Sequence, residues 1–352
     1  MESYQGYLKG RGSQINPHNR FKKHELDTEA EEGLDEAWEA KTETQVVYDH
    51  PKKILNKVSS PDIPFGWSIN PYQGCEHGCS YCYARNAHEY WGYSAGLDFE
   101  RIIIVKKNAP QLLEKELTHK KWQATPIMFS GNTDCYQPLE KKFELTRDCL
   151  DVFARYRHPV SLITKNRLIL RDLDLLQDLA KDDLVHVAIT ITTLNEDLRR
   201  RMEPRTSSAA KRLDTVRQLS EAGIPVHVML GPVIPSLNSH EIPELLKRSA
   251  EAGARGAGYT FVHLNGAVGG IFENWLRANY PDRADKVVHQ ISEAHGGGLN
   301  NSRFGVRMRG EGPIAETVRQ MFKLSKQKYF ADRHIPPYNL TAFRKPGQMN
   351  LF

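Results

Sequence analysis

The chain has few cysteines and no long apolar run, and each of these features argues against a class of protein. Its 352 residues include five cysteines, an odd number that argues against a disulfide framework. No run of about 18 apolar residues occurs, so no membrane-spanning helix is expected. Residues 1–12 contain no apolar core of a signal peptide. We therefore expect a cytoplasmic protein without membrane contact.

The net charge of the chain is also small. The net charge of +5 is compatible with nucleic-acid binding but too small to require it. With 39% hydrophobic residues, the chain can bury a large core as one α/β domain or as two smaller ones. No internal repeat or low-complexity segment stands out.

Three of the five cysteines are concentrated in eight residues. Cys75, Cys79 and Cys82 follow the spacing C-x3-C-x2-C, which offers three thiolates from one tight loop. A 4Fe-4S cluster held by three cysteines keeps one iron free for another molecule. A tetrahedral zinc site usually takes a fourth protein ligand, and His77 or His88 would complete a Cys3His site. The loop is interpreted as a cluster site, with zinc as the alternative.

After about residue 65, apolar and helical segments alternate. Short apolar runs, mostly rich in β-branched residues, lie at 67–70, 102–105, 127–129, 160–163, 185–191, 226–230 and 257–262. Segments with helical spacing lie at 109–122, 139–156, 172–181, 209–222 and 241–252. This alternation predicts a parallel sheet of βαβ units, and about seven strands favour a full or partial TIM-like barrel.

The sequence as a whole divides into four segments. We predict a polar arm at 1–60, the barrel at 61–300, a C-terminal extension at 301–345 and a tail at 346–352. Basic and acidic stretches in the arm are typical of a solvated segment. The alternatives are a lid over the barrel or phosphate contacts by Arg11, Arg20, Lys22 and Lys23.

Polar residues follow several of the predicted strands. They are Ser130, Gly131, Asn132, Thr133 and Asp134 after one strand, Lys165 after the next and Thr190 at the end of another. Ligands of parallel barrels bind at the carboxyl ends of the strands, so these residues together predict a polar pocket. Each one taken singly is equally compatible with an ordinary loop start or helix N-cap.

The cysteine spacing followed by Tyr83 resembles the signature of the radical S-adenosylmethionine (SAM) superfamily. Within it, the chain is similar to the branch related to spore photoproduct lyase, often labelled DNA-repair-photolyase-like. The similarity rests on the motifs that begin at Asn70, Gly131, Thr164, Glu203 and Arg307. It implies a partial TIM-like (β/α)6 radical SAM barrel with N- and C-terminal extensions.

The resemblance also implies a chemistry. Cys75, Cys79 and Cys82 would bind three irons of a 4Fe-4S cluster, and SAM would chelate the fourth. Reduction by an external electron donor would cleave SAM and give a 5'-deoxyadenosyl radical. The cofactor supplies this difficult step, and the protein supplies position and exclusion of water.

Family positions can be assigned residue by residue. Tyr83 would lie against the adenine, the turn from Ser130 to Asp134 would receive the methionine end of SAM, and Lys165 and Thr190 would contact SAM. The turn departs from the Gly-Gly-Glu-Pro of many members, so the ligand of the SAM amine stays open. Cys135 is a speculative hydrogen donor by analogy with spore photoproduct lyase, and a buried structural thiol is the alternative.

The C-terminal tail also points toward DNA, and a group of arginines offers a weaker signal. The tail residues Gln348, Leu351 and Phe352 resemble the pentapeptide by which bacterial replication and repair proteins bind the sliding clamp. Arginines that would contact nucleic-acid phosphates, or else form local ion pairs, are Arg199, Arg200, Arg201, Arg205, Arg303, Arg307 and Arg309. We expect a radical SAM enzyme acting on DNA. A tRNA or protein substrate, or a metal-stabilised binding module without catalysis, is the alternative.

Overall fold

The computed structural model describes residues 2–3, 8–21 and 43–345. The predicted clamp-binding residues Gln348, Leu351 and Phe352, and the lysines Lys22 and Lys23, lie outside the described residues. Within the described part, no helix is long and apolar enough to cross a membrane.

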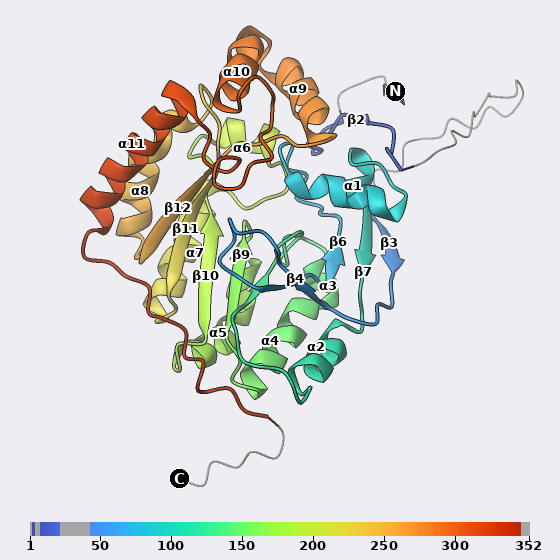
Figure 1. The fold of residues 1–352 in the computed structure, drawn as a ribbon, viewed down its shortest axis with the longest axis vertical. Helices are drawn as coiled ribbons and strands as arrows, with labels where there is room; N and C mark the ends of the chain where they lie inside the picture. The colour runs from blue at the N-terminus through green and yellow to red at the C-terminus, as the bar shows by residue number, and fades with distance from the viewer. Residues whose placement is uncertain (1, 4–7, 22–42, 346–352) are drawn as a thin grey trace, which may run out of the picture.

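A seven-stranded sheet forms the centre of the molecule (Figure 1), with the order β12-β11-β10-β9-β8-β5-β4. Six strands are parallel: β5 (Trp67–Ile69), β8 (Ile127–Phe129), β9 (Val160–Thr164), β10 (Val185–Thr190), β11 (Val226–Val233) and β12 (Gly256–Phe261). The edge strand β4 (Leu55–Lys57) is antiparallel. The inner strands are rich in Val and Ile because both faces of a parallel sheet are buried. The predicted partial (β/α)6 barrel is confirmed.

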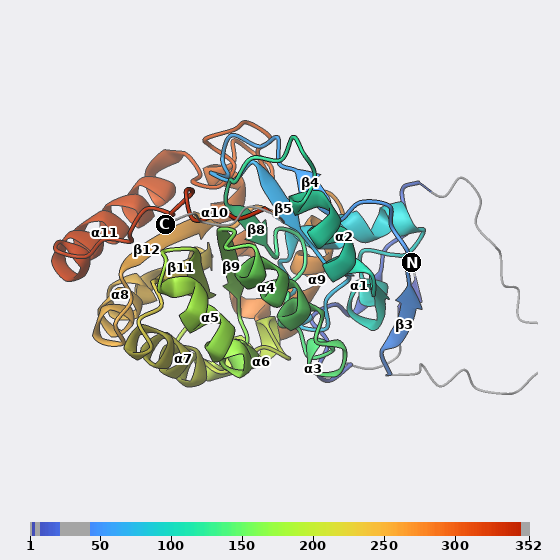
Figure 2. The ribbon, with the colours of Figure 1, turned by 90° about the horizontal axis from the view of Figure 1, so that it is seen from below.

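Helices cover the outer face of this sheet (Figure 2). They are α2 (Ala109–Leu117), α4 (Leu145–Arg155), α5 (Leu173–Ala180), α6 (Glu196–Met202), α7 (Ala209–Glu221) and α8 (Ile242–Glu251), with short 3-10 turns at Arg167–Asp172 and Ser239–Glu241. The short helix α3 (Glu140–Phe143) packs instead through Phe143 on a second, smaller core. Side-chain caps start two of them, since Asn195 and Ser208 accept hydrogen bonds from first-turn amides. The segment predicted as one helix at 139–156 is broken at Glu144, whose φ is 54°.

One predicted barrel strand belongs to a different sheet. Strand β7 (Ile102–Val105) pairs in parallel with β3 (Gln45–Tyr48) and antiparallel with β6 (Tyr72–Gln73). Its buried Ile103 and Val105 pack with Leu145 of α4 and with Tyr72, in a small core of their own. An apolar run predicts a strand, but its pairing partner is decided by such contacts.

The C-terminal part adds three helices: α9 (Val268–Asn279), α10 (Pro281–Ala294) and α11 (Gly312–Phe330). Helix α11 packs on α8 and β12. Residues 331–345 then run along the end of the barrel where the strands begin (Figure 1). There the amide of Asn339 donates to Asp183 O at 3.1 Å, and the amide of Arg344 donates to Tyr156 O at 2.9 Å.

A polar strap joins the two edges of the open barrel. Asp62, in the loop between β4 and β5, accepts from the amide of Gly305 at 2.6 Å and from Arg307 Nε at 2.7 Å. The Arg307 segment is tied to the far edge because the amide of Phe261 in β12 donates to Met308 O at 2.8 Å. The two loops meet in both views (Figures 1 and 2). The strap therefore bridges the side that six parallel strands leave open.

Candidate active site

The cysteine loop follows β6 and ends in the 3-10 helix η1 (Tyr83–Trp91). The thiols of Cys75 and Cys79 are buried, and that of Cys82 is partly exposed. Burial raises the pKa of Cys75 well above its ordinary value and that of Cys79 to about 12. These thiols therefore stay protonated unless a cation displaces the proton, as in a metal site.

The donor set fits a cluster better than a zinc ion. His77 is already engaged, with Nδ1 3.3 Å from Asp134 Oδ2 and Nε2 3.3 Å from Asn166 Nδ2. The ring of His88 packs between Tyr93 and Phe99. Across the described ranges, no three Cys, His, Asp or Glu side chains converge as ligands of one ion would. Three thiols without a fourth protein ligand match a 4Fe-4S cluster with one open iron.

A buried ion pair supports the loop from one side. Arg85 pairs with Glu100, and both side chains are fully buried. Arg85 Nε also donates to Cys79 O at 3.0 Å. Glu100 accepts from the amides of Gly12 at 3.1 Å and Ser13 at 2.7 Å. The buried charges are compensated by these bonds, so the pair holds the loop in one position.

The described part of the N-terminal arm packs against the back of the same loop. A Cβ added at Gly12 would lie 1.6 Å from Gly78 O, so the two backbones are in direct contact. Arg11 is 5% exposed, and its Nη1 donates to Glu100 O at 2.9 Å. Arg20 pairs with Glu89 at 3.1 Å. Residues 8–21 are thus part of the support of the cysteine loop, a role that their polar composition did not reveal.

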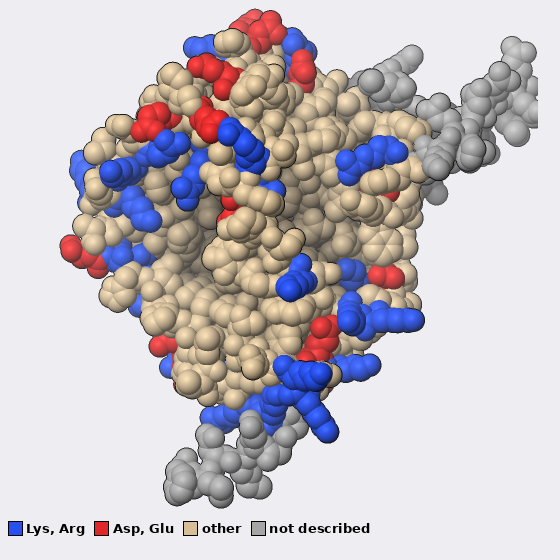
Figure 3. All heavy atoms as spheres, in the orientation of Figure 1, with Lys and Arg blue, Asp and Glu red and all other residues tan. Residues whose placement is uncertain are grey.

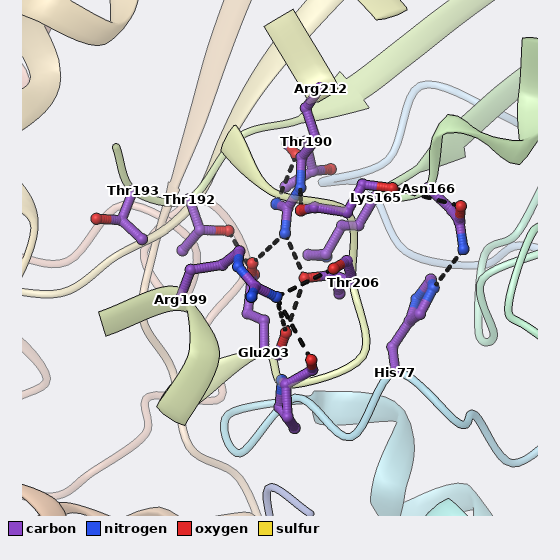
Figure 4. A network of polar contacts seen from close by, with 12 residues as sticks. His77, Lys165, Asn166, Thr190, Thr192, Thr193, Arg199, Glu203, Thr206 and Arg212 are labelled. Atoms are coloured by element: carbon purple, nitrogen blue, oxygen red, sulfur yellow. Dashed lines mark hydrogen bonds and ion pairs between the residues drawn. The ribbon is translucent and has the colours of Figure 1, made fainter. Parts of the chain in front are cut away.

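The loop between α6 and α7 supports the cysteine loop from the other side (Figure 4). Backbone bonds join the amide of Ser80 to Met202 O and the amide of Arg205 to His77 O. The carboxylate of Glu203 accepts hydrogen bonds from the buried Tyr81 hydroxyl, from Thr192 Oγ1 at 2.6 Å and from Arg212 Nη2 at 2.6 Å. Burial alone would raise the pKa of Glu203, but Arg212, Lys165 and these hydrogen bonds outweigh it and lower the pKa to about 2.

Lys165 supplies a cation at this end of the barrel. Burial alone would lower the pKa of its ammonium, but Cys79, Glu203 and Asp134 outweigh burial and raise it. The ammonium lies 5.9 Å from the ring centroid of Tyr81. Among the described residues it makes neither a hydrogen bond nor an ion pair. A carboxylate ligand would find this charge available.

The predicted SAM turn is tied into the protein at most of its positions. Asp134 accepts from Thr164 Oγ1 at 2.7 Å and from the amide of Lys165 at 2.9 Å, besides its contact with His77. Although burial opposes ionisation, these partners lower the pKa of Asp134 to about 2. Asn132 Nδ2 donates to Gln73 at 2.9 Å. Asp134 therefore serves the fold of the turn.

The remaining residues of the turn differ in whether their polar atoms already have hydrogen-bond partners. Ser130, with φ of 77°, accepts from the amide of Cys135 at 2.7 Å. Gly131 O accepts from the Tyr83 hydroxyl at 2.5 Å. The Thr133 hydroxyl is buried and has no hydrogen-bond partner in the described part of the chain. Of the side chains in this turn, Thr133 is thus the one with an unused buried polar atom.

The other predicted site residues differ in their exposure and in their contacts. The ring of Tyr83 is 49% exposed and stacks with His263, which follows β12, at a centroid distance of 6.2 Å. Thr190 ends β10, and its carbonyl accepts from Arg212 at 2.9 Å. Cys135 is 1% exposed in the main core, and burial raises its pKa well above the ordinary value. This position favours the structural role of Cys135 over hydrogen donation.

The predicted arginines are mostly engaged in local pairs. Arg199 is 7% exposed and donates to the carbonyls of Glu203 and Thr206. Arg303 pairs with Glu311, and Arg307 belongs to the strap. The residues that sequence reasoning missed, Arg85, Glu100 and Arg212, are isolated charges whose burial no local pattern indicates.

Comparison with known proteins identifies the class. A family model described as the radical SAM superfamily matches residues 69–248. The chain belongs to the radical SAM superfamily, whose members use a 4Fe-4S cluster and SAM, as the sequence predicted.

Uncharacterized relatives and one solved fold are similar to the chain. A protein of Mycobacterium tuberculosis (strain ATCC 25618 / H37Rv) is 35% identical over 66% of this chain and 69% of its own length. A protein of Methanocaldococcus jannaschii is 31% identical over 70% of this chain and 88% of its own. A spore photoproduct lyase mutant with bound AdoMet and dinucleoside spore photoproduct has a TM-score of 0.59 at 15% identity, covering 81% of this chain and 79% of that one. This last similarity concerns the fold.

Proposed function

We propose that Cys75, Cys79 and Cys82 hold the 4Fe-4S cluster of this radical SAM enzyme and leave one iron open to SAM. The observation that carries the proposal is the set of three thiols, on a loop fixed from both sides, with no fourth protein ligand in the part of the chain that the structure describes. When bound and reduced, the cluster supplies the electron that cleaves SAM to methionine and a 5'-deoxyadenosyl radical.

The chain's own residues bind and orient SAM. The free ammonium of Lys165 attracts the SAM carboxylate, and the unused hydroxyl of Thr133 offers a hydrogen bond to its methionine end. The half-exposed ring of Tyr83 provides an apolar face for the adenine. Thr190 lines the same end of the barrel. The strap of Asp62 and Arg307 limits the access of water to the open side.

We infer that the substrate is nucleic acid, most simply DNA, and that the reaction is a lyase-like repair or modification in the cytoplasm. Support comes from the shared fold with a spore photoproduct lyase solved with a dinucleoside spore photoproduct. Lys and Arg side chains, with some Asp and Glu among them, also lie around the hollowed centre of one face of the molecule (Figure 3). We further propose that the tail residues Gln348, Leu351 and Phe352 bind the sliding clamp.

The decisive experiment is anaerobic turnover. Protein reconstituted with iron and sulfide and reduced with dithionite should release 5'-deoxyadenosine from SAM. Single Cys→Ser changes at positions 75, 79 and 82 should each abolish this product, whereas the matched core variant Cys149→Ala should retain it. A fully loaded cluster without this product would sink the proposal.

The substrate is tested with deuterium. Candidate DNA, tRNA and protein substrates labelled with deuterium are supplied in turn, and transfer of the label into 5'-deoxyadenosine is measured. Transfer from DNA is expected. If the label moves only from tRNA or only from protein, that class of molecule would replace DNA as the proposed substrate.

A further inference from the structure

A surface depression adjoins the cysteine loop on the side of α3. It has a volume of about 300 Å³ and is lined by Glu76, Pro138, Leu139, Lys141 and Lys142. Helix α3 lies beside the three-stranded sheet in both views (Figures 1 and 2). None of these residues belongs to the SAM site described above.

The depression is connected directly to Cys75. Glu76 is the next residue along the chain and lines the depression. Gln137 holds the peptide on either side of Cys75, accepting from the amide of Glu76 at 3.0 Å and donating to Gly74 O at 3.3 Å. Pro138 and Leu139 follow Gln137 in sequence. A molecule seated in the depression therefore contacts Glu76, the chain neighbour of Cys75, and Pro138, the chain neighbour of Gln137.

The basic and the acidic side chains of this surface differ in their exposure and in their partners. Lys141 and Lys142 are exposed and form no ion pair within the described residues. Of the acidic groups nearby, Glu76 is buried, and its Oε1 accepts from Thr44 at 2.6 Å while its Oε2 has no hydrogen-bond partner among the described residues. Glu144 lies 3.6 Å from Arg171. The surface is positive because its lysines are exposed, whereas Glu76 is buried and Glu144 lies beside Arg171.

Aromatic and apolar side chains continue the surface. The half-exposed ring of Tyr48 meets that of Phe143 edge to face at 6.3 Å, and the exposed Lys107 holds its ammonium 3.9 Å from the Tyr48 ring centroid. Leu139 and Phe143 pack onto the three-stranded sheet, so the surface rests on a rigid core. We call Tyr48, Lys107, Leu139, Lys141 and Lys142 the lysine surface.

We propose that the lysine surface docks the electron donor, a small acidic protein that carries a one-electron cofactor, next to Cys75. The proposal rests on the proposed function, because only a reducible cluster needs such a partner. Charge complementarity speeds and orients such encounters, which are often small and transient. One electron passes from the reduced donor to the oxidised cluster, and the donor leaves oxidised by one electron.

Charge reversal tests the surface. The variant K141E/K142E is compared with wild type and with the control K120E/K121E, which changes the net charge equally at exposed lysines beyond α2. Each protein cleaves SAM either with dithionite or with an acidic flavodoxin, its reductase and NADPH. The flavodoxin-supported rate of K141E/K142E should fall at least tenfold, while its dithionite-supported rate stays within twofold of wild type. Added salt should narrow the difference, since it screens surface charges.

The milder variant K141Q/K142Q should show an intermediate fall, which keeps the test valid if charge reversal disturbs folding. An unchanged flavodoxin-supported rate, or an equal fall in the control, would overturn the docking proposal. An equal loss of the dithionite-supported rate would also overturn the docking proposal, because the lysines would then act on the cluster site. The proposal would likewise be overturned if the wild-type protein cleaved SAM with dithionite but never with flavodoxin. Wild type without dithionite-supported cleavage contradicts the proposed function instead.

Discussion

Gly12 has no side chain, and the space that a methyl group would need is occupied by the backbone of the cysteine loop. The Cβ of an alanine would lie 1.6 Å from Gly78 O, and backbone atoms cannot rotate away as a flexible side chain can. We expect Gly12→Ala to cost about 1–3 kcal/mol and to displace residues 8–16 from the loop. Iron and sulfide content after anaerobic reconstitution should fall to less than half of wild type.

The matched control for this change is Gly66→Ala. A Cβ at Gly66 would meet nothing within 4 Å, and its backbone conformation is open to alanine. This variant should load iron like wild type. If Gly12→Ala also binds a full cluster at unchanged thermal stability, the N-terminal arm does not support the loop.

At the scale of elements, the C-terminal segment 331–345 is held by a stacked pair. The rings of His186 in β10 and Tyr338 lie 3.8 Å apart. Burial lowers the pKa of His186 to about 4. The unfolded chain takes up a proton near pH 6.5 and the folded chain only near pH 4, so stability is complete above 6.5 and falls as the pH drops toward 4.

His186→Phe keeps the stacked ring and removes the titrating group. Relative to wild type, the variant should gain roughly 1 kcal/mol of stability between pH 7.5 and pH 5, allowing for partial exposure of the ring. Urea unfolding at the two pH values measures the difference. Equal shifts of both proteins would show that His186 does not titrate in this window.

At the scale of the whole molecule, the described chain ends far from the cysteines. Lys345 Nζ donates to the carbonyls of His119 and Lys120, just beyond the C-terminal end of α2. Helices of a βαβ unit end where the next strand begins, so residue 345 lies at the opposite end of the barrel from the cysteine loop (Figure 1). A partner bound beyond residue 345 would leave the candidate active site accessible.

Removal of residues 348–352 should therefore abolish sliding-clamp binding and leave SAM cleavage unchanged. A pull-down with purified clamp, with full-length protein as the reference, measures the first effect, and 5'-deoxyadenosine release measures the second. Clamp binding that survives the truncation would eliminate the role predicted for Gln348, Leu351 and Phe352.

The sequence by itself determined the barrel and its cofactors. Strand-helix alternation is a local pattern, so the six parallel strands could be predicted from short windows of residues. The spacing of Cys75, Cys79 and Cys82 is local too, and their role as cluster ligands stays a prediction. Lys165 could be singled out because it follows a strand.

Only the tertiary structure decided which groups support the cysteine loop and which groups bridge the open side of the barrel. Glu100 meets Gly12 across 88 residues, Glu203 meets Tyr81 across 122, and Asp62 meets Arg307 across 245. It also placed β7 in a second sheet and bound Asp134 to Thr164 and Lys165 at the end of β9. The physical reason is the same in each case: a buried charge or a strand edge needs a partner, and the folded chain, rather than the neighbouring sequence, supplies it.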